Sequence, residues 1–116
     1  MTARTRGTIV PSHLTTHILD ATSGTPATGV SVTLTDAAGA EVARGLTDDD
    51  GRLGLGPDVL APGDYALTFA TGPYFSARGV EAFYPTVTVA FTVADRPHYH
   101  VPLMLSPFAY TTYRGS

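Results

Sequence analysis

Two histidines stand one residue apart near the end of this 116-residue chain, in the stretch HYHVPLML, and the chain closes on YRGS. Alternate side chains of a strand point to opposite faces, so His98 and His100 would share one face while Tyr99 and Val101 point into a core. The imidazole pKa is ordinarily about 6.5, so a neutral histidine can take a proton from water near neutral pH. The stretch therefore indicates a chemically active face close to the carboxyl terminus.

Three interpretations of these histidines stay open from the residue types alone. They could be ordinary residues of a strand surface. Together with His17 on a neighbouring strand they could bind a metal ion, and without cysteine the other ligands would be carboxylates or water. They could also form a metal-free site in which a neutral imidazole activates water. A domain of this size has little room for a deep pocket, which favours a site built between subunits.

Composition narrows the class of protein. With 43% hydrophobic and 15% charged residues, the chain has enough apolar side chains for one core. The net charge of −3 argues against a nucleic-acid partner, and the absence of lysine excludes Schiff-base and P-loop chemistry. No apolar run approaches the ~20 residues of a membrane span, and residues 1–12 resemble a flexible arm rather than a secretory signal. We expect a cytoplasmic protein with one domain over 13–116 and no membrane partner.

The elements that must position the histidines are almost all predicted strands. Period-two alternation, interrupted by turn signals, predicts an all-β sandwich of two sheets with seven to eight strands. Residues 71–83 break the alternation and predict one short helix. Asp20 is expected to cap a turn, and His13 is expected to lie at the surface or beside the reacting groups. Strands are predicted in residues 13–20, 30–36, 41–47, 64–70, 84–94, 98–105 and 109–116, and the polar turn TDDDGRLGLG is expected to lead into a further short strand that is interrupted by glycine.

Several of these stretches together resemble the 5-hydroxyisourate hydrolases, the transthyretin-like enzymes of urate breakdown. The resemblance rests on the terminal YRGS, on HYHVPL before it, on THILD near the start, and on TDDDGR, GDYALTFATGPYF and FYPTVTVAF between them. It covers residues 13–116, with Met104 in place of the usual leucine as a minor departure. The tripeptide that eukaryotic members append after YRGS is missing, which favours a bacterial, cytoplasmic form.

The resemblance implies a fold, an assembly and a reaction. The fold would be a transthyretin-like sandwich of two four-stranded sheets. Two subunits would pair edge to edge, and two such dimers would pack face to face into a homotetramer with active sites at the interface between the dimers. The reaction would be hydrolysis of the small molecule 5-hydroxyisourate to 2-oxo-4-hydroxy-4-carboxy-5-ureidoimidazoline. This cyclic amidase would use no metal and no other cofactor.

The resemblance also implies roles for individual residues. Catalytic roles fall on His17, Arg52, His100 and Ser116. Substrate-binding roles fall on His17, Arg52, Tyr113, Arg114 and Gly115. One imidazole would activate water while the other orients it or protonates the leaving nitrogen, and either histidine could be the base. Arg52 would hold and polarise the substrate oxygens through its planar guanidinium, and Ser116 with the terminal carboxylate would hydrogen-bond to a histidine or to the substrate.

Two other functions compete with the hydrolase. A transthyretin-like tetramer could carry a small aromatic ligand in its channel without reacting with it. A monomeric sandwich of the adhesion type would have no use for the terminal YRGS. Two histidines, an arginine and a polar tetrapeptide suit a reaction better than storage, because a carrier needs an apolar and accessible channel.

Overall fold

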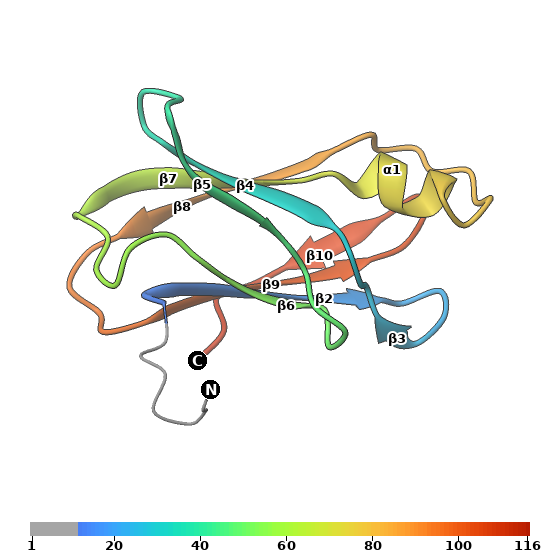
Figure 1. Cartoon of the computed structure of the whole chain (residues 1–116), viewed down its shortest axis with the longest axis horizontal. Coiled ribbons are helices and arrows are strands. Elements are labelled where there is room, and N and C mark those ends of the chain that lie inside the picture. The colour runs from blue at the N-terminus through green and yellow to red at the C-terminus, as the bar shows by residue number, and fades with distance from the viewer. Residues whose placement is uncertain (1–11) are drawn as a thin grey trace.

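Two β-sheets pack face to face in the computed structural model, which describes residues 12–116 (Figure 1). The first sheet contains β10 (Tyr110–Thr112), β9 (Tyr99–Leu105), β2 (Leu14–Asp20), β3 (Thr25–Pro26) and β6 (Arg52–Leu55). The second contains β5 (Glu41–Leu46), β4 (Ser31–Asp36), β7 (Gly63–Phe69) and β8 (Val87–Val93). The helix α1 (Thr71–Ser76) follows β7 at one end of the sandwich.

The predicted two-sheet sandwich with one short helix is confirmed, but its strand count needs correction. Residues 12–116 contain nine strands rather than seven to eight, and the sheets hold five and four strands rather than four each. The fifth strand appears because two short strands share one edge of β2: β6 pairs with Leu14–His17, and β3 pairs with Leu19 and Asp20. The two-residue β3 is too short to show any alternation.

Alternating side chains fill the core between the sheets. The fully buried large side chains come from both sheets and from α1: Phe69, Phe75, Leu14, Ile18, Leu34, Leu67, Leu103, Leu105, Val30, Val32, Val87 and Val93. The residues that alternate with the core positions of β2 and β9 lie on the outer face of the first sheet, where Thr15, His17 and His100 are half-buried. Pro102, which strand alternation puts on the same face as His100, is buried.

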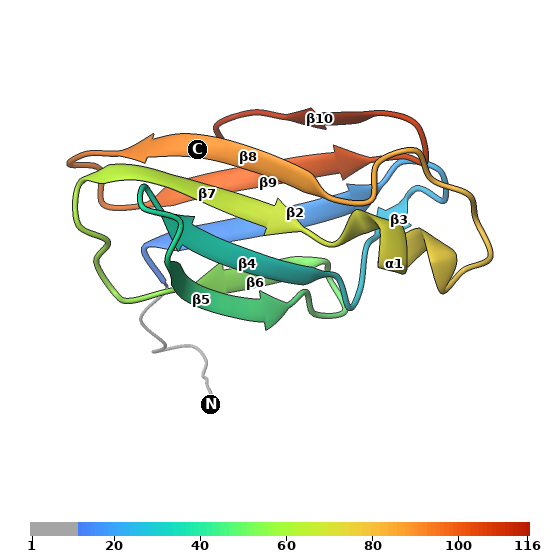
Figure 2. The same ribbon diagram turned by 90° about the horizontal axis from the view of Figure 1, so that it is seen from above.

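β2 lies between β9 and β6, and this arrangement brings distant parts of the chain together (Figure 2). β2 and β9 run parallel, with Thr15 opposite His100. β6 runs antiparallel along the other edge of β2, with Arg52 opposite His17. Three sequence-distant segments therefore place an arginine and two histidines on neighbouring strands.

The helix α1 is fastened to the first sheet by a buried carboxylate. Asp20 is 4% exposed and accepts a hydrogen bond of 2.8 Å from the Tyr74 hydroxyl. The other carboxylate oxygen accepts the N–H of Thr22 at 2.9 Å, which confirms the predicted turn cap. Burial, followed by this hydrogen bond, raises the pKa of Tyr74 to about 12. Within residues 12–116, no helix has the length and apolarity needed to cross a membrane.

Candidate active site

The His100 ring is held by contacts on two sides. Its Nδ1 lies 2.8 Å from the Thr15 hydroxyl oxygen. On the other side, a Cβ atom added at Gly115 would lie only 2.5 Å from Cδ2 of the ring, so only glycine leaves the imidazole its place. Within the described residues, the Nε2 atom of His100 has no protein hydrogen-bond partner. The ring therefore presents one free nitrogen.

The carboxyl-terminal segment reaches His100 by following β9. β10 ends at Thr112 rather than extending over 109–116 as predicted, but pairing resumes in an isolated bridge between Gly115 and His100. The Gly115 N–H donates to the His100 carbonyl at 2.8 Å. The ladder is interrupted where the partner strand contains Pro102, which has no N–H to donate. The Thr112 hydroxyl donates to the Pro102 carbonyl at 2.8 Å instead.

Arg52 is placed by the tight turn that precedes β6. Asp48 forms this turn by accepting hydrogen bonds from the N–H groups of Asp50 at 2.9 Å and Arg52 at 3.0 Å. Gly51 has φ +73°, and any Cβ there would collide with the Ile18 carbonyl, so the DDDGR turn requires glycine at this position. In the part of the chain that the structure describes, the one ion pair joins two other residues, so the Arg52 guanidinium has no carboxylate partner.

The electrostatics of the site favour a neutral His100. Burial lowers the pKa of His100 below its ordinary value, and the positive charges of His98, Arg52 and His17 lower it further, in that order. A hydrogen bond with the Thr15 backbone opposes this lowering of the His100 pKa. A neutral imidazole with an unpartnered nitrogen is chemically a base.

Two hollows meet at His100. One of about 320 Å³ is lined by Thr15, Thr16, Asp48, Arg52, Leu53, Gly54, His98, His100 and Ser116. The other, of about 290 Å³, is lined by Val89, Ala90, Phe91, Thr92, Tyr99, His100, Val101, Thr112, Tyr113 and Arg114. The predicted residues Arg52, His100 and Ser116 thus share the first hollow, while Tyr113 and Arg114 lie in the second. His17 lines neither, although it lies close enough to influence the charge of His100.

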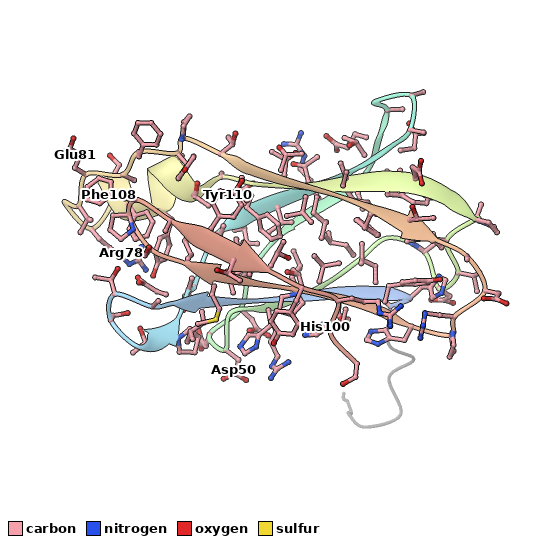
Figure 3. The ribbon with its side chains drawn as sticks, turned by 180° about the vertical axis from the view of Figure 1, so that it is seen from behind. Asp50, Arg78, Glu81, His100, Phe108 and Tyr110 are labelled. Carbon is pink, nitrogen blue, oxygen red and sulfur yellow. The ribbon has the colours of Figure 1, made fainter. Side chains whose placement is uncertain are left out.

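The site lies on the outer face of the first sheet, away from the helix. Figure 3 shows His100 and Asp50 near the same lower face, with Arg78 and Glu81 at the helical end of the molecule. Among residues 12–116, no three His, Cys, Asp or Glu side chains converge closely enough to hold a metal ion. The arrangement offers a base, a cationic donor and a hollow open to a small molecule.

Two residues were misplaced or missed by reasoning from the sequence. The expectation that His13 lies at the surface is wrong: it is 5% exposed, with its Nδ1 accepting the Leu60 N–H at 2.8 Å and its Nε2 donating to the Arg96 carbonyl at 2.7 Å. Thr15, which contacts the imidazoles of both His98 and His100, was not singled out. The alternation of β2 puts Thr15 on the same face as His17. Only the parallel pairing of β2 with β9 brings Thr15 beside the two imidazoles.

The chain is similar to several known proteins in sequence and in fold. The sequence model of the transthyretin group, described as "HIUase/Transthyretin family", matches residues 14–115. The chain is 45% identical over 113 residues to 5-hydroxyisourate hydrolase of Mus musculus, covering 90% of this chain and 96% of that one. It superposes with a TM-score of 0.83 on 5-hydroxyisourate hydrolase of Klebsiella pneumoniae, at 39% identity, covering 90% of this chain and 100% of that one. Sea bream transthyretin in complex with thyroxine gives a TM-score of 0.78 at 32% identity, covering 89% of this chain and 94% of that one.

Proposed function

Since this chain belongs to the HIUase/Transthyretin family, we propose that it hydrolyses 5-hydroxyisourate to 2-oxo-4-hydroxy-4-carboxy-5-ureidoimidazoline. It is a hydrolase of urate breakdown. The observation that carries this proposal is the meeting of His17, Arg52 and His100 from three strands on one sheet face, beside the terminal YRGS. The cytoplasm is the proposed compartment, and fractionation of the producing cells would test it.

The proposed reaction begins with water attacking a ring carbonyl of the substrate. A histidine of the His17/His100 pair takes the proton of that water, which typically contributes about 10²–10⁴-fold to the rate. The carbonyl carbon becomes tetrahedral, the ring C–N bond breaks, and the leaving nitrogen takes up a proton. His100 fits the base role because its pKa is lowered and its Nε2 is free.

Arg52 has the role of stabilising negative charge on the carbonyl oxygen. Its guanidinium has no carboxylate partner among residues 12–116, and it lines the same hollow as His100 and Ser116. A planar guanidinium donates two parallel hydrogen bonds to oxygen atoms of a flat substrate, which fixes the ring in line with the water. Charge stabilisation of this kind is often the largest single contribution to catalysis.

A homotetramer, a dimer of dimers, completes the proposal. The site is an open hollow on the outer face of a sheet, so a second subunit facing it would cover the substrate. The exposed apolar side chains of Met104 and Tyr113, 43% and 59% exposed, lie on the same sheet and on the terminal segment. Such exposed apolar surface is typical of an interface.

A carrier of a small aromatic ligand is the second candidate function. It is favoured by the likeness to the thyroxine-bound sea bream protein and by the mainly apolar hollow that contains Val89 and Phe91. The first hollow is mostly polar and contains an arginine and two histidines. This composition favours the hydrolase.

Turnover of freshly made 5-hydroxyisourate tests the proposal. Uricase acting on urate generates the intermediate, and its absorbance decay is followed with and without this protein. Arg52→Ala and His100→Ala should lose most of the acceleration, whereas Arg44→Ala, which breaks an exposed ion pair on the other sheet, should keep it. Unchanged decay with the folded wild-type protein would reject the hydrolase, and thyroxine-like binding without turnover would support the carrier. Gel filtration tests the tetramer.

A further inference from the structure

The hydroxyl of Thr15 lies between two imidazoles. Its oxygen is 2.9 Å from Nε2 of His98 and 2.8 Å from Nδ1 of His100. The two rings stack with centroids 6.3 Å apart and planes 20° from parallel. The parallel pairing of β2 with β9 produces this geometry, because it places Thr15 opposite His100. His98, two residues earlier, lies on the same side.

Counting protons shows that the two imidazoles cannot be equivalent. A hydroxyl has one proton to donate and two lone pairs that accept. If Thr15 donates to His98, then Nδ1 of His100 must carry a proton and donate to Thr15, which leaves Nε2 of His100 unprotonated. If Thr15 donates to His100 instead, Nε2 of His100 carries the proton and cannot act as a base.

We propose that Thr15 is a positioning residue which, with His98, holds His100 in the Nδ1-protonated form and relays a proton between the two histidines during the reaction. This inference rests on the proposed hydrolase function. Two observations favour the arrangement. Of the two ring nitrogens of His100, only Nε2 has no protein hydrogen-bond partner among residues 12–116, while the other side of the ring is packed against Gly115. His98 is exposed, so water can satisfy its remaining Nδ1–H.

Protons and charge are conserved at each step of this relay. As the water oxygen bonds to the substrate carbon, a water proton moves to Nε2 of His100. The Nδ1 proton of His100 passes to the Thr15 oxygen while the Thr15 hydroxyl proton passes to Nε2 of His98. The positive charge therefore moves from a half-buried ring to an exposed one, where hydration stabilises it. When the ring C–N bond breaks, Nε2 of His100 gives its proton to the leaving nitrogen and the relay runs backwards.

In this series of proton transfers, His100 acts first as the base and then as the acid. His17, opposite Arg52 and outside the first hollow, would then orient the reacting groups rather than transfer the proton. The charged or titratable groups that face His100 are His98 just before β9, His17 from β2 and Arg52 from β6, together with those that line the two hollows, Asp48, Tyr113, Arg114 and the carboxylate of Ser116.

Matched variants of Thr15 test the relay. Thr15→Val keeps the shape but removes the hydroxyl, and Thr15→Ser keeps the hydroxyl. With the tetramer and 5-hydroxyisourate, we expect Thr15→Val to lower kcat about 10–100-fold with KM within about twofold, since partners that orient a histidine have effects of this size at metal sites. Thr15→Ser should retain kcat within about threefold. Equal kcat values for Thr15→Val and wild type would overturn the inference.

A readout without substrate separates this inference from the proposed function. Nitrogen-15 NMR of the imidazoles should show Nδ1 protonated and Nε2 unprotonated for His100 in the neutral wild-type protein, and a shift toward the other tautomer in Thr15→Val. This result is expected even if the wild type hydrolyses nothing, in which case only the hydrolase proposal fails. An Nε2-protonated His100 in the wild type, or one unchanged in Thr15→Val, would overturn the inference.

His98→Phe provides a second variant at an exposed position. It keeps a ring beside His100 but removes the proton acceptor, so kcat should fall about tenfold or more and rise again when imidazole buffer is added. A merely structural loss would not respond to a small proton acceptor in solution. Full activity of His98→Phe without buffer, or a loss that imidazole fails to restore, would contradict the relay.

Discussion

Replacing Gly115 with alanine would place a methyl group against the imidazole of His100. The added carbon would lie 2.5 Å from Cδ2, 3.1 Å from Cγ and 3.3 Å from Cβ of His100. Carbon atoms pack best at about 3.5–4.0 Å, so the ring and the terminal segment must move apart by about 1 Å. A misplacement of about 1 Å in a reacting group can lower the rate about 10²-fold. We therefore expect kcat of Gly115→Ala to fall about 100-fold.

The stability of the fold should change little in this variant. Gly115 lies outside the sheets, joined to β9 by an isolated bridge. Gly24→Ala is the converse control, because a Cβ at Gly24 would meet no atom within 4 Å but Gly24 has φ +72°. A side chain in this left-handed conformation costs about 1–2 kcal/mol. Gly24→Ala should therefore lower the free energy of unfolding and leave turnover unchanged.

The assay is the decay of 5-hydroxyisourate after uricase treatment of urate, with urea unfolding measured on the same preparations. The reasoning predicts opposite profiles: low turnover with normal stability for Gly115→Ala, and normal turnover with low stability for Gly24→Ala. A Gly115→Ala protein with kcat within about twofold of wild type would refute the assignment of His100 and its contact with Gly115 to the reaction.

Four further predictions concern pH and stability. Because burial favours neutral His100 and lowers its pKa, kcat/KM should hold down to about pH 6.5 and fall only below it; an acidic limb centred above pH 7 would contradict this. Just below pH 6.5, His100 then binds more protons in the unfolded chain than in the folded one. Its contribution to the free energy of unfolding should therefore decrease as the pH falls through that range, which urea unfolding at several pH values would show. Tyr74→Phe leaves one oxygen of the buried Asp20 without its donor and should lower the free energy of unfolding by about 1–3 kcal/mol. An unchanged urea midpoint in this variant would show that the contact does not stabilise the fold. His13→Phe leaves the buried N–H of Leu60 without an acceptor and should lower the free energy of unfolding by about 1–3 kcal/mol, whereas Arg44→Ala, measured in parallel, should leave the urea midpoint almost unchanged because its ion pair is exposed.

Strands in which apolar and polar residues alternate strictly were predictable from the sequence. Contacts between strands that lie far apart in the sequence were not. Alternation in 13–20 puts Leu14 and Ile18 on one face and His17 on the other, and in the structure the first face is buried and the second half-buried. It also gave no sign that Pro102 would be buried, because burial depends on which segment covers the outer face. β10 ends at Thr112 because its partner strand β9 contains Pro102. The residues of β10 alone therefore do not reveal where the strand ends.

The candidate site was predictable through its motifs rather than through its geometry. The resemblance selected His17, Arg52 and His100, and the register of β6, β2 and β9 then places these residues on neighbouring strands. Thr15 carried no signal of its own, since a threonine on a strand surface is common. His13 looked equivalent to His98, and only the path of the loop through Leu60 distinguishes a buried histidine from an exposed one.

The parallel pairing of β2 with β9 also has a consequence for biosynthesis. Thr15 and His100 are separated by 85 positions in the chain, which a ribosome adding 5–20 residues per second covers in roughly 4–17 s. β6 can occupy one edge of β2 about midway through this interval, but the edge that receives β9 stays open until β9 itself has been synthesised. Nascent or prematurely released chains would therefore display an uncovered, apolar strand, so products of interrupted translation should be clients of chaperones or seeds of aggregates. Thr15 and His100 therefore come together only after all of the chain between them has been synthesised.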